Sequence, residues 1–151
     1  MSVDLSESDL AAYFALRRAA DRLQRTLERQ LREHGLSEVQ FAILARLAEG
    51  LSGIGMTALA NDLVVTKGGL TYQARQLEGR GLVARSGSAH DERAVLIRLT
   101  DEGVRLLDAV MPRHVELLRE LFIDRVSPSD LLVMRAALER VATPEATIAE
   151  C

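Results

Sequence analysis

The spacing of hydrophobic and polar residues along the chain predicts six helices, five of which begin with the same local signal. At each of these starts a Ser or Thr follows an apolar residue, and another apolar residue stands four positions later, as in a capped helix with a hydrophobic staple. The five capping residues are Ser6, Ser37, Thr66, Thr100 and Ser127. Gly35 and Gly50 stand where helices are expected to end. The predicted helices span residues 7–34, 38–49, 58–64, 67–79, 101–122 and 128–141.

Between the fourth and fifth helices the pattern changes to that of two short strands. Residues 82–86 (LVARS) and 94–99 (AVLIRL) are short runs rich in Val, Ile and Leu, which favour strands. The polar GSAHDER segment between them predicts a turn, so the two strands should form a hairpin. The pattern therefore predicts a mainly α fold with one small β-hairpin.

The third and fourth predicted helices form a helix-turn-helix pattern. The segment TALANDLVVTKGGLTYQARQL reads as a helix, a tight turn and a second helix, an arrangement that can place the second helix in the major groove of DNA. On that second helix, Leu70, Ala74 and Leu77 are spaced to form a buried stripe. The opposite face carries Gly68, Thr71, Tyr72, Arg75, Gln76 and Gly79.

Two adjacent glycines, Gly68 and Gly69, stand in the first turn of this second helix, although glycine weakens a helix by roughly 1 kcal/mol relative to alanine. One interpretation is that they let backbone N–H groups at the helix N-terminus approach a phosphate closely, where the helix dipole favours an anion. The other is that they form a long turn before a surface helix. The glycines alone do not decide between the two.

Composition places the chain among folded single domains and limits its chemistry. Its 151 residues are 48% hydrophobic and 27% charged, which is too apolar for a disordered chain. No apolar run reaches the length of a membrane-spanning helix, the N-terminus is unlike a signal peptide, and the single Cys151 excludes a disulfide framework. We therefore expect a cytoplasmic protein. The net charge is −3, but residues 66–98 carry +3 and the rest −6, so a basic segment lies within an acidic chain.

With the hairpin included, the sequence resembles the MarR family of winged helix-turn-helix transcriptional regulators. The matching stretches are LANDLVVTKGGLTYQARQLEGRGLVAR and AHDERAVLIRLTDEG, in the order and spacing of that family. The resemblance covers nearly the whole chain and implies one domain over residues 1–151. Within it, residues 38–99 would form the winged DNA-binding region. Residues 1–37 and 100–151 would form the helices that join two chains into a homodimer.

The resemblance also assigns residues to DNA contacts. Three residues at the start of the recognition helix would hold phosphates, and four on its exposed face would contact bases and phosphates. The three are Thr66, Lys67 and Gly68, and the four are Thr71, Tyr72, Arg75 and Gln76. At the wing tip, Arg93 would enter a narrow minor groove, which attracts arginine, while Asp91 would orient its guanidinium. Tyr72, Arg75 and Gln76 depart from the residues that family members often carry, so the family's base preferences are not carried over.

Apolar residues on the terminal helices support dimerisation independently of the resemblance. Leucines run along the first helix, and further apolar residues run along the fifth and sixth, more than a small winged domain can cover. An intramolecular helical bundle is the alternative. Family members commonly bind a small aromatic or phenolic anion between the dimer helices and the winged region. Tyr13, Phe14, Arg17 and Arg46 are candidates to line such a pocket, but core packing or solvation explains them as well, so the ligand-binding residues stay unknown.

Enzymatic and metal-binding functions find no support in the sequence. His34, His90 and His114 show no recognised metal-ligand spacing, and no catalytic triad or Gly-rich phosphate loop is identifiable. No cofactor is expected. We therefore expect a sequence-specific, ligand-responsive repressor that binds a pseudo-palindromic operator as a homodimer. The alternative is a winged-helix protein-interaction module without operator specificity.

Overall fold

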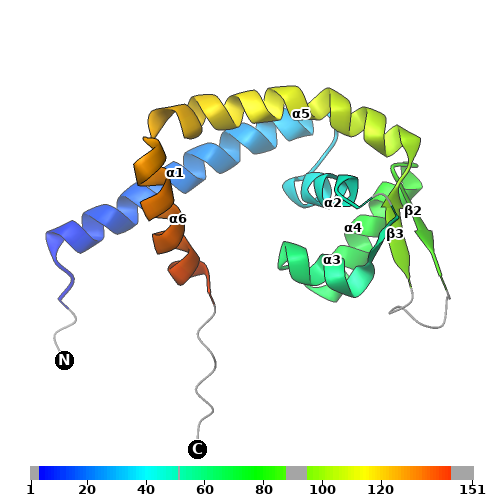
Figure 1. Cartoon of the computed structure of the whole chain (residues 1–151), viewed down its shortest axis with the longest axis horizontal. Helices are drawn as coiled ribbons and strands as arrows, with labels where there is room; N and C mark the ends of the chain where they lie inside the picture. The colour runs from blue at the N-terminus through cyan, green and yellow to red at the C-terminus, as the bar shows by residue number, and fades with distance from the viewer. Residues whose placement is uncertain (1–3, 51, 88–94, 144–151) are drawn as a thin grey trace, which may run out of the picture.

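The computed structural model describes residues 4–50, 52–87 and 95–143 (Figure 1). Its helices are α1 (Glu7–Arg32), α2 (Glu38–Ala48), α3 (Met56–Leu63), α4 (Lys67–Gly79), α5 (Asp101–Leu121) and α6 (Pro128–Ala142). Its strands are β1 (Ile54–Gly55), β2 (Val83–Ser86) and β3 (Leu96–Leu99), and a short 3-10 helix, η2 (Ile123–Arg125), joins α5 to α6. None of the described helices combines the length and the hydrophobicity that crossing a membrane requires. The predicted fold, mainly α with a small β-hairpin, is confirmed.

All five predicted capping residues cap a helix. Ser6 and Ser37 form reciprocal capping boxes with the third residue of their helices. The other three accept the backbone N–H of the residue three positions further on, at 3.1 Å in each case; these are Thr66, Thr100 and Ser127. Each cap satisfies an N–H group that no helical carbonyl can reach, and it therefore fixes where the helix begins.

The start of α3 and the strand before it differ from the predicted pattern. Helix α3 begins at Met56 rather than at residue 58, and its N-cap is Gly55, which has no side chain to mark the start. Instead, the Met56 N–H donates to the Val95 carbonyl at 3.2 Å, while Ile54 and Gly55 pair with β3 as the short strand β1. A strand of two residues that depends on a distant partner leaves no periodic pattern in the local sequence.

The three strands form an antiparallel sheet in the order β1-β3-β2. The pairing of β2 with β3, from Val83 opposite Leu99 to Ser86 opposite Leu96, confirms the predicted hairpin. On the central strand, the Ile97 side chain is fully buried. The sheet is thereby fixed to the helical core, and the hairpin leads directly into α5.

Figure 1 shows two parts joined at one end of the long helices. Helices α1 and α5 pack along each other, and α6 turns back from the end of α5; these three helices are called the arm below. Helices α2, α3 and α4 form the winged part together with the sheet. The largest side chains that are less than 2% exposed are Leu31, Leu36, Ile43, Leu44, Leu47, Leu59, Leu70, Leu77, Ile97 and Val110. Because Leu31 and Val110 belong to α1 and α5, this core also joins the arm to the winged part.

The arm is far less buried than the winged part. No residue of α6 is buried, and α1 buries only Gln30 and Leu31. Large apolar side chains stay open to solvent on both helices: Tyr13 is 54% exposed, Phe14 51% and Leu132 65%. Exposed apolar side chains that gather into a large patch commonly mark an interface.

Candidate nucleic-acid interface

A short turn joins α3 to α4 and completes the helix-turn-helix. Val64 closes α3 in the left-handed conformation (φ 54°, ψ 44°), and the Val65 N–H bonds the Ala60 carbonyl at 3.1 Å. Thr66 then caps α4. Val64 is a β-branched residue in a conformation that such residues avoid. Its side chain is 90% exposed, so packing of that side chain does not offset the backbone strain.

Helix α4 has a buried face and an exposed face, as its pattern predicts. Leu70, Ala74 and Leu77 are at most 1% exposed and lie in the core. Six of the residues assigned to DNA are exposed: Thr66, Lys67, Gly68, Tyr72, Arg75 and Gln76. Thr71 is half-buried, and its Oγ1 donates to the Lys67 carbonyl at 2.9 Å, so its hydroxyl proton is already used within the helix. The contacts of these residues with DNA stay predictions.

The two glycines at the start of α4 stand there for different reasons. An added Cβ at Gly69 would lie 3.0 Å from Thr66 Oγ1, the atom that caps the Gly69 N–H, so the cap itself leaves little room for a side chain. At Gly68 an added Cβ would meet nothing within 4 Å, and φ is not positive. Neither crowding nor backbone conformation explains Gly68. Its exposed position at a helix N-terminus suits the close approach of a phosphate.

Two cations of the basic segment are occupied within the protein. Arg85 on β2 pairs with Glu78 of α4 at 2.7 Å, and this hydrogen-bonded contact holds the pKa of the Glu78 carboxyl below its usual range. Arg80 donates to the Gly35 carbonyl at 2.7 Å, in the turn between α1 and α2. The charge count from the sequence therefore overstates the basic surface that is free to meet DNA.

The tip of the wing, which carries Asp91 and Arg93, lies outside the described residues, as does His90. The base of the wing is described: β2 follows the end of α4, and β3 leads through Thr100 into α5. The sheet shares its core with α4, so the base of the wing and the recognition helix are packed together. The assignment of Asp91 and Arg93 to the minor groove stays a prediction.

Among the described residues, a buried polar cluster joins α1 to α5 within the arm and lies against α2 of the winged part; sequence reasoning did not find it. Gln30 of α1 donates through Nε2 to the Val110 carbonyl at 3.2 Å, and its Oε1 lies 3.0 Å from His114 Nδ1. Because the Gln30 Oε1 only accepts, the proton lies on His114 Nδ1. The His114 ring also packs against Phe41 of α2, with ring centroids 4.3 Å apart, and burial lowers its pKa. Within the described ranges, no three His, Cys, Asp or Glu side chains gather as they would around a metal ion.

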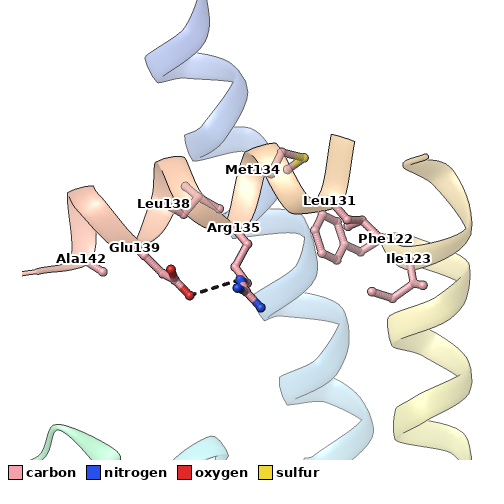
Figure 2. Close-up of a pocket in the computed structure, with 8 residues that line it drawn as sticks. All are labelled: Phe122, Ile123, Leu131, Met134, Arg135, Leu138, Glu139 and Ala142. Carbon is pink, nitrogen blue, oxygen red and sulfur yellow. Dashed lines mark ion pairs between the residues drawn. The ribbon is translucent and has the colours of Figure 1, made fainter. Parts of the chain in front are cut away.

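An apolar groove lies on the arm, between the end of α5 and α6 (Figure 2). Its volume is about 530 Å³, and it is called the α5–α6 groove below. Six apolar residues line it: Phe122, Ile123, Leu131, Met134, Leu138 and Ala142. Figure 2 shows Arg135 and Glu139 beside it, joined by an ion pair of 3.4 Å. Both of these side chains are more than half exposed, so the groove opens toward solvent.

The chain is similar to known regulators over most of its length. The MarR family model matches residues 36–95. The HTH-type transcriptional regulator PecS of Dickeya dadantii is 31% identical over 140 residues, which span 91% of this chain and 84% of PecS. Among solved structures, the MarR family regulator Sco3205 of Streptomyces coelicolor, in complex with DNA, has a TM-score of 0.87 at 29% identity and covers 96% of this chain and 94% of its own. CouR of Rhodococcus jostii, bound to p-coumaroyl-CoA, has a TM-score of 0.76 at 26% identity, with 95% and 97% covered.

The family model covers the winged part, whereas the similarities to PecS and Sco3205 extend over the arm as well. All of them agree with the resemblance seen in the sequence. The relatives are transcriptional regulators, in agreement with the prediction that the chain is not an enzyme. None of the relatives described above supports a protein-interaction module without operator specificity. The chain belongs to the MarR family and is a DNA-binding transcriptional regulator.

Proposed function

We propose that the chain represses transcription by binding a pseudo-palindromic operator as a homodimer, and that a small ligand releases it. The observation that carries this proposal is the contrast between two surfaces. Helix α4 presents an exposed polar face beside a tightly packed core, while α6 has no buried residue. The first surface suits DNA, and the second suits another copy of the chain. As a regulator of cellular genes, it would act in the cytoplasm.

The proposed DNA contacts follow the length of α4. Lys67 and Gly68 stand at its N-terminus, where backbone N–H groups and the helix dipole favour a phosphate. Arg75 and Gln76 lie about two turns further along, where side chains can reach base edges in the major groove. Tyr72 adds an aromatic surface that is 61% exposed. Phosphate and base contacts are also assigned to Thr66 and Thr71, and minor-groove contact to Asp91 and Arg93.

The proposed dimer interface consists of the exposed apolar surface of the arm. The α5–α6 groove and the exposed Tyr13 and Phe14 rings are apolar surfaces, and burying such surface contributes about 25 cal/mol per Å². Residues 1–37 and 100–151 would therefore form the dimerisation region, and residues 38–99 the DNA-binding region. Two-fold symmetry would place the two α4 helices about 34–36 Å apart, facing successive major grooves.

The proposed effector is a small aromatic or phenolic molecule. This part of the proposal rests on the family and on CouR, whose structure holds p-coumaroyl-CoA. Of the residues suggested from the sequence, Arg46 is held by Asp62 at 2.9 Å and Glu49 at 3.1 Å. Tyr13 and Phe14 contact each other edge to face, with centroids 5.4 Å apart, on the open part of α1. Neither observation marks a ligand site, so the pocket residues are not assigned.

Two measurements and one truncation test the proposal. Selection of binding sites from random DNA should enrich one palindromic motif, and sedimentation should give twice the 16.6 kDa of the chain. Truncation before α6 should abolish the dimer and operator binding together. A monomer that binds the motif as tightly as the full chain would contradict the dimer. A selection that enriches no motif would contradict operator specificity.

A further inference from the structure

The C-terminal end of the recognition helix α4 is hydrogen-bonded to the turn that follows α1. Arg80 is the C-cap residue of α4. Its Nη1 donates to the Gly35 carbonyl at 2.7 Å, and its Nη2 points to the His34 carbonyl at 3.4 Å. These carbonyls belong to the turn that ends α1, where carbonyl groups lack helical partners. An added Cβ at Gly35 would lie 3.4 Å from Arg80 Nη2, so the guanidinium lies against this turn.

The same end of α4 is tied to α5 on its other side. Thr100, the N-cap of α5, donates through Oγ1 to the Gly81 carbonyl at 2.6 Å and through its backbone N–H to the Leu82 carbonyl at 3.2 Å. Gly103 packs so closely that an added Cβ would overlap the Leu82 carbonyl oxygen. The backbone that follows α4 is therefore held between the two long helices of the arm.

The hydrophobic core restricts the orientation of α4 relative to the arm less than these hydrogen bonds do. Leu31 of α1 and Leu77 of α4 belong to one apolar cluster, which resists separation of the two helices. Apolar contact has no directional preference, so small rotations of α4 against α1 are opposed only by packing. The hydrogen bonds of Arg80 depend on angle as well as distance. They therefore restrict the orientation of α4 relative to the arm.

We propose that Arg80 is a positioning residue that fixes the angle of the recognition helix against the arm and thereby sets the spacing of operator half-sites. The inference rests on the proposed dimer, because spacing has meaning only when two α4 helices bind one DNA. In that dimer, the distance between the helices depends on how rigidly each winged part is held to the shared arm. If the junction is stiff, the dimer binds an operator of the wrong spacing with lower affinity. If the junction is loose, the two α4 helices can shift to match that spacing.

The test compares operators that share the same half-sites and differ in the number of base pairs between them. Binding of each is measured for the wild type, Arg80→Met and Arg80→Lys over a salt series. Both variants should reduce the discrimination between the best spacing and its one-base-pair neighbours by roughly five- to tenfold, which is about what the loss of one ordinary hydrogen bond costs. Arg80→Lys keeps the charge, so it should keep the salt dependence of the wild type. The control is Arg105→Met, which removes an exposed arginine of α5 paired with Glu102 and should leave the spacing preference intact.

The outcomes separate the explanations. If Arg80→Met weakens binding equally at every spacing and lowers the salt slope by about one, Arg80 is a phosphate contact and the inference is wrong. If both variants keep the spacing preference of the wild type, the inference is also wrong, while the proposed dimer stands. If the wild type itself shows no preferred spacing, the dimeric operator proposal fails as well. Circular dichroism checks that each variant is folded. If Arg80→Met does not fold, the comparison is made with Arg80→Lys alone.

A second measurement needs no DNA. Spin labels at Gln76→Cys, in a Cys151→Ser background, report the distance between the two recognition helices of the dimer. The wild-type distance distribution should be narrow, and Arg80→Met and Arg80→Lys should broaden it. Identical distributions in all three proteins would overturn the positioning role of Arg80.

Discussion

Replacing Gly103 with alanine should lower the free energy of unfolding, because the loss from overpacking exceeds the gain from helix propensity. Gly103 lies in the first turn of α5, where alanine would stabilise an isolated helix by about 1 kcal/mol relative to glycine. An added Cβ, however, would overlap the Leu82 carbonyl oxygen and lie 2.9 Å from Leu99 Cδ2 and 3.1 Å from the Leu82 carbonyl carbon. The closest obstacle is backbone, which cannot turn away as a flexible side chain can.

The size of this loss in unfolding free energy can be estimated from the groups that the added methyl group would displace. Overpacking a buried site costs about 1–3 kcal/mol. Moving the Leu82 carbonyl also strains its bond to the Thr100 N–H, now 3.2 Å long, and a hydrogen bond of this kind contributes about 1 kcal/mol. Against a gain of about 1 kcal/mol from helix propensity, the net loss is about 2 kcal/mol. For a domain of this size such a loss lowers the melting temperature by roughly 4–8 °C.

The assay is thermal and urea unfolding at one fixed protein concentration, because dimerisation makes the melting temperature depend on concentration. Gly68→Ala is the matched control. It is also a first-turn glycine, but an added Cβ there meets nothing within 4 Å, so it should raise stability by up to about 1 kcal/mol. If Gly103→Ala melts at or above the wild-type temperature, the Leu82 carbonyl does not crowd position 103, and the reasoning is wrong.

Three other predictions concern the turn, the DNA-facing residues and the buried histidine. Val64→Gly should raise the unfolding free energy by about 1 kcal/mol, because it relieves a left-handed β-branched residue without loss of packing; equal stability would contradict strain there. Lys67→Ala should weaken binding to all DNA alike and lower the salt slope by about one, whereas Arg75→Ala should relax preference at one base pair per half-site, as single-base operator variants would report. Burial lowers the pKa of His114, so the fold opposes its protonation. Stability should therefore fall as the pH drops below about 6.5, the value of an unfolded histidine. His114→Gln should reduce that pH dependence, and an unchanged pH profile would exclude His114 as its source.

Local signals in the sequence were sufficient to predict most of the fold. Helix caps such as Ser37 act over three or four residues, so the five predicted helix starts could be identified without knowledge of the tertiary structure. Strand β1 could not, because Ile54 forms a strand only by pairing with Ile97. The start of α3 was misplaced for the same reason, since its first N–H is satisfied by Val95 on the neighbouring chain segment rather than by a local cap.

The exposed face of α4 could be predicted from the sequence, but which of its neighbouring cations are unpaired could not. The spacing of Leu70, Ala74 and Leu77 fixes which face of α4 is exposed, so the residues opposite could be named from the sequence. Counting cations treats every arginine as available. Arg80 and Arg85 are instead bound to a carbonyl and a carboxylate of other elements, and such pairings depend on tertiary contacts that the count does not contain.

Gly68 shows how local stability and DNA binding can favour different residues at one position. Glycine there provides no positive φ and relieves no crowding, so folding alone would favour alanine by about 1 kcal/mol. A methyl group on the exposed first turn would instead stand beside the backbone N–H groups that we assign to a phosphate, and it would hold that phosphate away from them. Gly68→Ala should therefore melt at a higher temperature and bind DNA more weakly, with a similar loss for specific and random sequences because phosphate contacts carry no base preference. If the variant is more stable and binds both DNAs as tightly as the wild type, the phosphate does not approach α4 at Gly68.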